Sequence, residues 1–206
     1  MGALSVNPTP GLEGIRQRAE PEEYFSMALE LLDQNLGKSP QGSVLDVGPV
    51  CGENISYFAT RVKRLYLCDL FLRLKIDQEK ELPVEALWRH LDYPVEAFEG
   101  ILIWDLVDRL DGEQTERLVG ILDHLLKPGG IVTVFALGQS GITTEVYSFA
   151  LMGDYRVRPR RQRHLELPRV FRQNREILDL FDAFVPVKSF RYRNGFREFV
   201  FRKNKL

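Results

Sequence analysis

The chain has 206 residues, of which 44% are hydrophobic and 28% are charged, and its net charge at pH 7 is −1. This length and composition fit one globular domain with an ample core, and the balanced charge gives no sign of a polyanionic partner for the molecule as a whole. The two cysteines, Cys51 and Cys68, are too few for a disulfide framework, and no Cys/His pair has zinc-ligand spacing, so we expect no metal site.

The sequence contains no run of 18 uninterrupted apolar residues, and its first ten residues lack the basic and apolar regions of a signal peptide. We therefore expect a soluble cytoplasmic protein without a membrane partner.

Charge is distributed unevenly along the chain. Residues 155–206 carry 15 Lys and Arg against 5 Asp and Glu, whereas the first 154 residues carry 13 against 24. Such asymmetry can mark a region that binds anions, which would include RNA or an acidic protein. The interpretation that we favour is that acidic and basic faces pair within one molecule or across a homodimer.

The N-terminal part is predicted to be a leader followed by a helix. Residues 1–20 contain two prolines and three glycines, which is typical of a flexible segment, and residues 21–206 would form the domain. Pro21 suits the first position of a helix, and Gly37 supplies a stop signal. The expected helix has one apolar face, formed by Phe25, Leu29, Leu32 and Leu36.

Strand-like and helix-like segments then alternate, which indicates a parallel sheet with helices on both faces. We expect five strands, at Val44–Val47, Leu65–Cys68, Trp88–Leu91, Gly100–Leu106 and Ile131–Leu137. The expected helices between them are Glu53–Arg61, Leu70–Glu81 and Gly112–Leu126.

The end of the chain departs from this alternation. A helix is predicted over Arg175–Phe184, and two strand-like runs, Val187–Arg193 and Phe196–Arg202, flank Asn194-Gly195. Asn-Gly between two such runs is a strong hairpin signal. The predicted fold is therefore α/β, with a mostly parallel seven-stranded sheet that ends in an antiparallel hairpin.

The order of several short motifs resembles the class I S-adenosylmethionine-dependent methyltransferases. These motifs are Val-Leu-Asp-Val-Gly-x-x-x-Gly-x-Asn at residues 44–54, the strand-end Asp69, Leu91-Asp92, Ile-Trp-Asp at 103–105, Lys-Pro-Gly-Gly at 127–130 and the terminal hairpin. The resemblance runs from about Pro21 to Lys203. It implies a Rossmann-like three-layer sandwich, S-adenosylmethionine as the cofactor, and methyl transfer as the reaction.

The resemblance also implies which residues line the cofactor site. The glycine loop that approaches the amino-acid part of the cofactor would consist of Asp46, Gly48, Pro49 and Gly52, ordered by Asn54. Asp69, followed by Leu70, would accept hydrogen bonds from both ribose hydroxyls.

Two further pairs complete the implied site. Asp92 and Tyr93 would face the adenine, and Trp104 and Asp105 would lie near the methionine end. For Trp104, core packing is the more common role of a tryptophan at such a position, and both interpretations stay open here.

One position departs from the family pattern, because Val50 stands where the central glycine of the loop is usual. A β-branched residue is poor at positive φ, so we expect the loop to follow a different path.

The acceptor is expected to be a small molecule, with RNA or protein kept open by the basic C-terminal quarter. Specificity should lie in residues 139–172, which follow the fifth strand and include His164, a weak candidate for a general base. No catalytic residue can be assigned from the sequence.

Two alternatives to an active methyltransferase remain. One is a catalytically inactive methyltransferase-like module with a binding or regulatory role, favoured by Val50 and the missing base. The other is a nicotinamide-dependent oxidoreductase, although Gly48-Pro-Val-Cys-Gly52 lacks the expected Gly-x-Gly-x-x-Gly spacing.

Overall fold

The main sheet has six strands in the order β3-β2-β4-β5-β9-β8. The computed structural model describes residues 22–37, 42–138 and 144–205, so the predicted leader lies outside the described residues. The strands are β2 (Ser43–Asp46), β3 (Arg64–Leu67), β4 (Phe98–Leu102), β5 (Leu126–Leu137), β8 (Val185–Arg191) and β9 (Phe196–Arg202). The first four run parallel to one another, and β9 is antiparallel to both β5 and β8.

The predicted third strand is wrong, which is why the main sheet has six strands in the described chain and not seven. Residues 85–88 form the short helix α4 (Glu85–Trp88), and the 3-10 turn η1 (Arg89–Leu91) follows directly. Good helix formers at Glu85, Ala86 and Leu87 favour a turn of helix over a strand.

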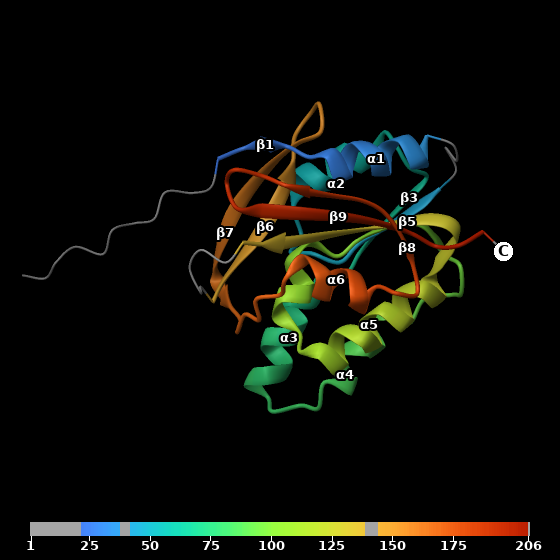
Figure 1. Ribbon diagram of the computed structural model, residues 1–206. Coiled ribbons are helices and arrows are strands. Elements are labelled where there is room, and N and C mark those ends of the chain that lie inside the picture. The colour runs from blue at the N-terminus through green and yellow to red at the C-terminus, as the bar shows by residue number, and fades with distance from the viewer. Residues whose placement is uncertain (1–21, 38–41, 139–143, 206) are drawn as a thin grey trace, which may run out of the picture.

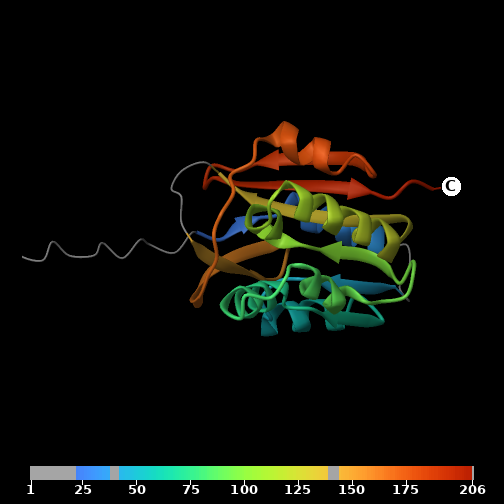
Figure 2. The same ribbon diagram turned by 90° about the horizontal axis from the view of Figure 1, so that it is seen from below.

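Helices cover both faces of the main sheet, as predicted. They are α1 (Met27–Leu36), α2 (Gly52–Ala59), α3 (Leu70–Glu79), α5 (Gly112–Leu125) and α6 (Asn174–Leu180), with the 3-10 segment η2 (Trp104–Arg109) after β4. Figure 1 shows α1 and α2 on one side of the sheet and α5 and α6 on the other. Figure 2, seen from below, shows α5 and α6 lying along the strands.

The first helix starts later than predicted. Tyr24–Phe25 form the two-residue strand β1, and α1 begins after Ser26, whose Oγ accepts a hydrogen bond from the Leu29 N–H at 3.0 Å. Phe25 is consequently not on the buried helix face, which consists of Ala28, Leu29, Leu32 and Leu36. A serine cap is a better start signal than the proline on which the prediction relied.

Two further boundaries differ from the prediction. The fourth strand ends at Leu102, because the chain turns into η2 there. The fifth begins at Leu126, which already pairs with Phe98, and a bulge over 127–130 precedes the pairing of Ile131 with Gly100. The C-terminal hairpin is confirmed.

A second, three-stranded sheet in the order β1-β7-β6 takes two of its strands, β6 and β7, from the segment expected to determine specificity. It consists of β1, β6 (Glu145–Leu151) and β7 (Arg156–Glu166), all antiparallel. Figure 1 shows this sheet at the end of the main sheet to which the β5 arrow points. Its strand β7 carries five arginines of the basic C-terminal quarter and forms a basic run.

Much of the charge in that basic run is paired within the molecule. Arg156 and Arg158 both pair with Glu23, Arg160 pairs with Glu53 at 2.6 Å, and Arg161 pairs with Glu145 at 3.1 Å. This arrangement agrees with the favoured interpretation of the charge asymmetry for this part of the chain. Among the described residues, no helix is long and apolar enough to cross a membrane.

Replacement of Gly195 by Ala is expected to lower the free energy of unfolding by about 1 kcal/mol, because Gly195 has a φ of +91° in the β8–β9 turn. Gly120→Ala is the matched control. Gly120 lies inside α5 with no atom within 4 Å of an added Cβ, so Ala there should stabilise the protein by about 0.5–1 kcal/mol. Urea unfolding of both variants measures the two shifts, and an unchanged Gly195→Ala would contradict the assigned turn.

Candidate functional site

Two acidic residues that were predicted to share a site lie at the ends of neighbouring parallel strands. Asp46 ends β2 and pairs in register with Leu67 of β3, and its carbonyl accepts a hydrogen bond from the Cys68 N–H at 2.9 Å. Asp69 follows Cys68 at once. Burial raises the pKa of Asp46, and the negative charge of Asp69 contributes to the same shift, so the two carboxylates are close enough to interact.

The Asp46 carboxylate is almost fully occupied by donors from the protein. Its Oδ1 accepts hydrogen bonds from the Gly48 N–H at 3.1 Å and the Trp104 indole N–H at 2.6 Å, and its Oδ2 accepts one from the Asn54 amide at 3.2 Å. Asp46 is 3% exposed, and three donors compensate its burial. This carboxylate therefore organises the glycine loop.

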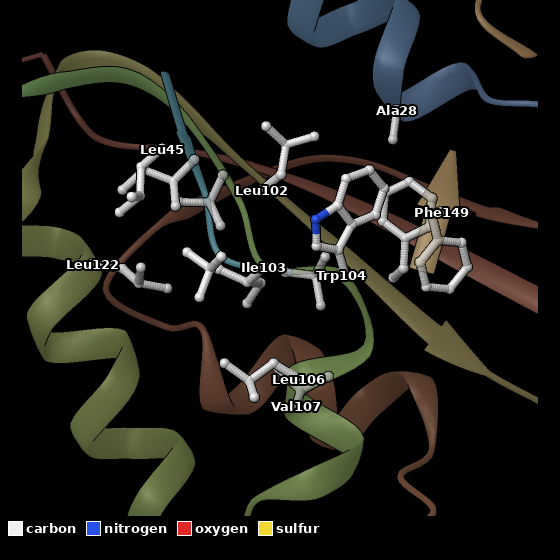
Figure 3. Close-up of a cluster of buried hydrophobic side chains, with 14 of the residues drawn as sticks. Ala28, Leu45, Leu102, Ile103, Trp104, Leu106, Val107, Leu122 and Phe149 are labelled. Carbon is white, nitrogen blue, oxygen red and sulfur yellow. The ribbon is translucent and has the colours of Figure 1, made fainter. Parts of the chain in front are cut away.

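The Trp104 side chain fills the space above the glycine loop. A Cβ added to Gly48 would lie 2.2 Å from Trp104 Cδ1, so glycine is required there by the indole. Trp104 is 1% exposed and stacks on Phe149 of β6, with ring centroids 5.3 Å apart and an interplanar angle of 4°. Figure 3 shows the two rings side by side, with Leu102 and Ile103 leading to Trp104.

The backbone at Trp104 is strained. Its φ is +48°, a left-handed conformation that costs a bulky L-residue about 1 kcal/mol or more. The hydrogen bond to Asp46 and the ring contacts with Phe135 and Phe149 hold the residue in this conformation.

The Asp69 carboxylate accepts fewer side-chain hydrogen bonds within the protein than the Asp46 carboxylate does. Its Oδ1 caps α3 by accepting a hydrogen bond from the Leu72 N–H at 2.9 Å. Burial raises its pKa, while backbone donors at Leu72, Val50 and Phe71 and the nearby His164 oppose the shift. Asp69 is only half-buried, so it keeps acceptor capacity for a ligand.

The glycine loop accommodates Val50 without a positive φ. Val50 is 58% exposed and is not among the described residues with positive φ. The loop thus avoids the conformation that a β-branched residue tolerates poorly.

The β6–β7 hairpin is fastened to elements beside Asp46 and Asp69, at the strand ends where an open α/β sheet is expected to have its ligand crevice. The Leu151 N–H of β6 donates to Asn54 Oδ1 of α2 at 2.8 Å, and Lys75 Nζ of α3 donates to the His164 carbonyl at 2.8 Å. On the far side, Arg109 of η2 donates to the Glu145 carbonyl at 2.7 Å. The hairpin therefore covers the ends of the central strands.

Asn54, Trp104 and Gly48 thus converge on Asp46, whereas other residues implied by the resemblance lie apart from it. Asp92 is exposed, and Tyr93 packs edge-on against Tyr66 and Phe98. Both line a cavity of about 1030 Å³ between η1 and α5, whose described lining includes neither Asp46 nor Asp69.

The remaining implied residues have roles within the protein. Asp105 forms a fully buried ion pair with Arg109 at 2.9 Å, and Leu70 and Pro49 are buried. An added Cβ at Gly52 would meet no described atom within 4 Å.

Sequence reasoning missed the aromatic partners of Trp104. Phe149 belongs to a strand that was read only as part of a specificity segment, although the β-branched and aromatic residues in Val146-Tyr147-Ser148-Phe149 are typical of a strand. Phe135 was placed correctly on the fifth strand without a role in the site.

No model of a known protein family matches the chain, and no curated protein matches it. Its structure is similar to an S-adenosylmethionine-dependent methyltransferase from Clostridium acetobutylicum, with a TM-score of 0.57 and 10% identity over 85% of this chain and 89% of that one. It is also similar to 1,6-didemethyltoxoflavin-N1-methyltransferase from Burkholderia thailandensis, solved with 1,6-didemethyltoxoflavin and S-adenosylhomocysteine. That match has a TM-score of 0.52 and 18% identity over 86% of this chain and 77% of that one.

The chain has the fold of a class I methyltransferase. A third neighbour, the N-methyltransferase NodS from Bradyrhizobium japonicum, agrees, with a TM-score of 0.52 and 15% identity over 86% of this chain and 94% of that one. The TM-scores of 0.52–0.57 show the shared fold, and at identities of 10–18% they show the fold alone.

Asp46→Ala is expected to lower the free energy of unfolding by about 3 kcal/mol or more, because three buried donors lose their acceptor. Asp69→Ala removes one helix cap and should cost about 1 kcal/mol. Equilibrium unfolding in urea compares the two variants. Equal losses would contradict the distinct roles given to these carboxylates.

Proposed function

We propose that the chain is an S-adenosylmethionine-dependent methyltransferase that acts on a small-molecule acceptor. The observation that carries the proposal is the placement of Asp46 and Asp69 at the ends of two neighbouring parallel strands, next to the glycine loop. Ligands of open α/β sheets bind outside the carboxyl ends of the strands, at such a point.

The Asp69 carboxylate has the chemistry to bind the ribose of the adenosyl group. The space above Gly48, however, has no room for that group in the described conformation. Asp69 retains acceptor capacity for ribose hydroxyls. The indole of Trp104 lies against Gly48, and its N–H donates a hydrogen bond to Asp46. Cofactor binding therefore requires Trp104 to leave its position.

The cost of moving Trp104 can be bounded. Exposing a large buried side chain costs about 1.5–3 kcal/mol, and breaking its hydrogen bond to a carboxylate costs about 1.5–3 kcal/mol more, offset by about 1 kcal/mol of backbone strain. A net cost of about 2–5 kcal/mol would weaken the apparent cofactor affinity by roughly 30- to 5000-fold. We therefore expect weak cofactor binding to the free protein.

Once Trp104 has moved away from Gly48, different residues of the chain would have different roles. Asp69 would hold the ribose, and Asp46 would keep the glycine loop in place. The hairpin of β6 and β7 would exclude water and present the acceptor, which matters because holding reactants in line supplies much of the rate enhancement. The cofactor, when bound, supplies an already activated methyl group.

A small-molecule acceptor is favoured by two observations. The Burkholderia neighbour was solved with 1,6-didemethyltoxoflavin bound, and four arginines of the basic strand β7 are paired with Glu23, Glu53 and Glu145. Paired charges are less available to RNA or to an acidic protein surface.

The same indole favours a second candidate, a methyltransferase-like module without turnover. Trp104 is 1% exposed, stacks on Phe149 and donates a hydrogen bond to Asp46, as a tryptophan with a purely structural role in the core does. In that case the fold would serve binding or regulation, and the crevice would stay closed.

Calorimetric titration with S-adenosylhomocysteine separates these candidates. For the methyltransferase we expect measurable binding to the wild-type protein and at least about tenfold tighter binding to Trp104→Ala, because the variant removes the occupant of the crevice. Phe181→Ala, which deletes another buried aromatic ring away from the crevice, is the matched control and should bind like the wild type.

Absence of binding to a folded Trp104→Ala protein would overturn the methyltransferase proposal and support the module. Asp69→Asn, made in the Trp104→Ala background, tests the ribose contact. Asn preserves the cap of α3 but removes the charge, and it should weaken binding by about 1.5–3 kcal/mol.

A further inference from the structure

A cavity other than the one lined by Asp92 and Tyr93 lies beside the β8–β9 turn and next to Gly138 at the end of β5. It has a volume of about 930 Å³ and is lined by Gly138, Phe171, Gln173, Asn174, Arg191, Tyr192, Arg193, Gly195 and Arg197. The described lining contains three arginines and no carboxylate. The cavity is separate from the crevice of Asp46 and Asp69, neither of which lines it.

The buried Arg197 brings positive charge to this cavity, and Arg172, whose carbonyl accepts a hydrogen bond from Arg197 at 2.8 Å, lies next to it. Arg197 and Arg172 are each 5% exposed, and neither lies within 4 Å of a carboxylate oxygen of the described chain. Their guanidinium groups donate instead to uncharged acceptors, among them the Leu137 carbonyl at 2.9 Å from Arg197 and the Leu110 carbonyl at 2.6 Å from Arg172. Buried charges are normally paired or serve a ligand.

Burial lowers the pKa of Arg197, and the positive charges of Arg169 and Arg191 act in the same direction. Asp108 and Glu176 oppose this shift from a distance. Arg197 adds its positive charge to a described lining that contains no carboxylate.

The exposed groups of the cavity are hydrogen-bond donors. Arg191 and Arg193 are exposed, and within the described residues neither has an ion-pair partner. Asn174 Oδ1 accepts a bond from Arg197 at 2.8 Å, which leaves its NH₂ group as a donor. Tyr192 directs its hydroxyl elsewhere, to Glu198 at 2.7 Å.

Phe171 gives the cavity an apolar wall. Its ring is 38% exposed, and the Arg197 guanidinium lies 5.3 Å from its centroid. Donors on one side and an exposed ring on the other suit a ligand that carries a negative group on an apolar or aromatic body.

We propose that this cavity binds a small organic anion, with Arg191 and Arg193 contacting its phosphate or carboxylate group and Phe171 contacting its apolar part. The buried Arg197 contributes further positive charge at the wall of the cavity. The proposal does not rest on methyl transfer, because it concerns a different set of residues.

Calorimetric titration with phenyl phosphate at low salt tests the site, with benzoate as the monoanionic comparison. The wild-type protein should bind at least one of the two probes. The double variant Arg191→Ala/Arg193→Ala should bind it about tenfold more weakly or worse, as expected for the loss of charge-assisted hydrogen bonds. Tighter binding of phenyl phosphate would identify a phosphate ester as the natural chemistry, and tighter binding of benzoate a carboxylate.

The matched control is Lys63→Ala/Arg64→Ala, which removes the same charge from exposed positions beside β3. This control should leave probe affinity unchanged, and the arginine double variant should leave S-adenosylhomocysteine binding unchanged. The proposal is overturned if neither probe binds the wild type at millimolar concentration, or if the control weakens binding as much as the double variant does.

Discussion

The hydrogen bond between the Trp104 indole and the Asp46 carboxylate is the interaction on which the functional edge of the sheet depends. It joins the end of β2 to the first residue of η2, just after β4, and it holds the indole against Gly48. Because Asp46 also binds the Gly48 N–H and Asn54, the glycine loop, the start of α2 and the exit of β4 share one buried acceptor.

At this site the fold favours binding of a cofactor, whereas the packing of Trp104 opposes it. The parallel strands bring Asp46 and Asp69 together, as a nucleoside-binding sheet requires. The indole then takes the space beside them, stacked on a strand of the second sheet. The balance between cofactor affinity and the packing of Trp104 decides between an enzyme with a closed resting state and a module without turnover.

The sequence predicted the alternation of strands and helices because that pattern is carried by local periodicity. The helices α2, α3 and α5 begin and end within two residues of their predicted bounds, and Asn194-Gly195 marked the hairpin correctly. Trp88–Leu91 failed because a four-residue run is too short for periodicity to separate strand from helix.

The neighbours of the candidate site were harder to predict than its members. Asp46, Gly48 and Asn54 lie within nine residues of one another, so one local motif predicted their proximity. Phe149 and Leu151 reach the same place from about 100 residues further along the chain. Such contacts depend on how the hairpin folds back over the sheet, which no local pattern encodes.

The central claim is that Trp104 occupies the crevice, and acrylamide quenching of its fluorescence tests this most directly. The chain has two tryptophans, so Trp88→Phe leaves Trp104 as the sole reporter. The account predicts blue-shifted emission that acrylamide barely quenches without ligand. Strong quenching and red-shifted emission in the ligand-free protein would contradict it.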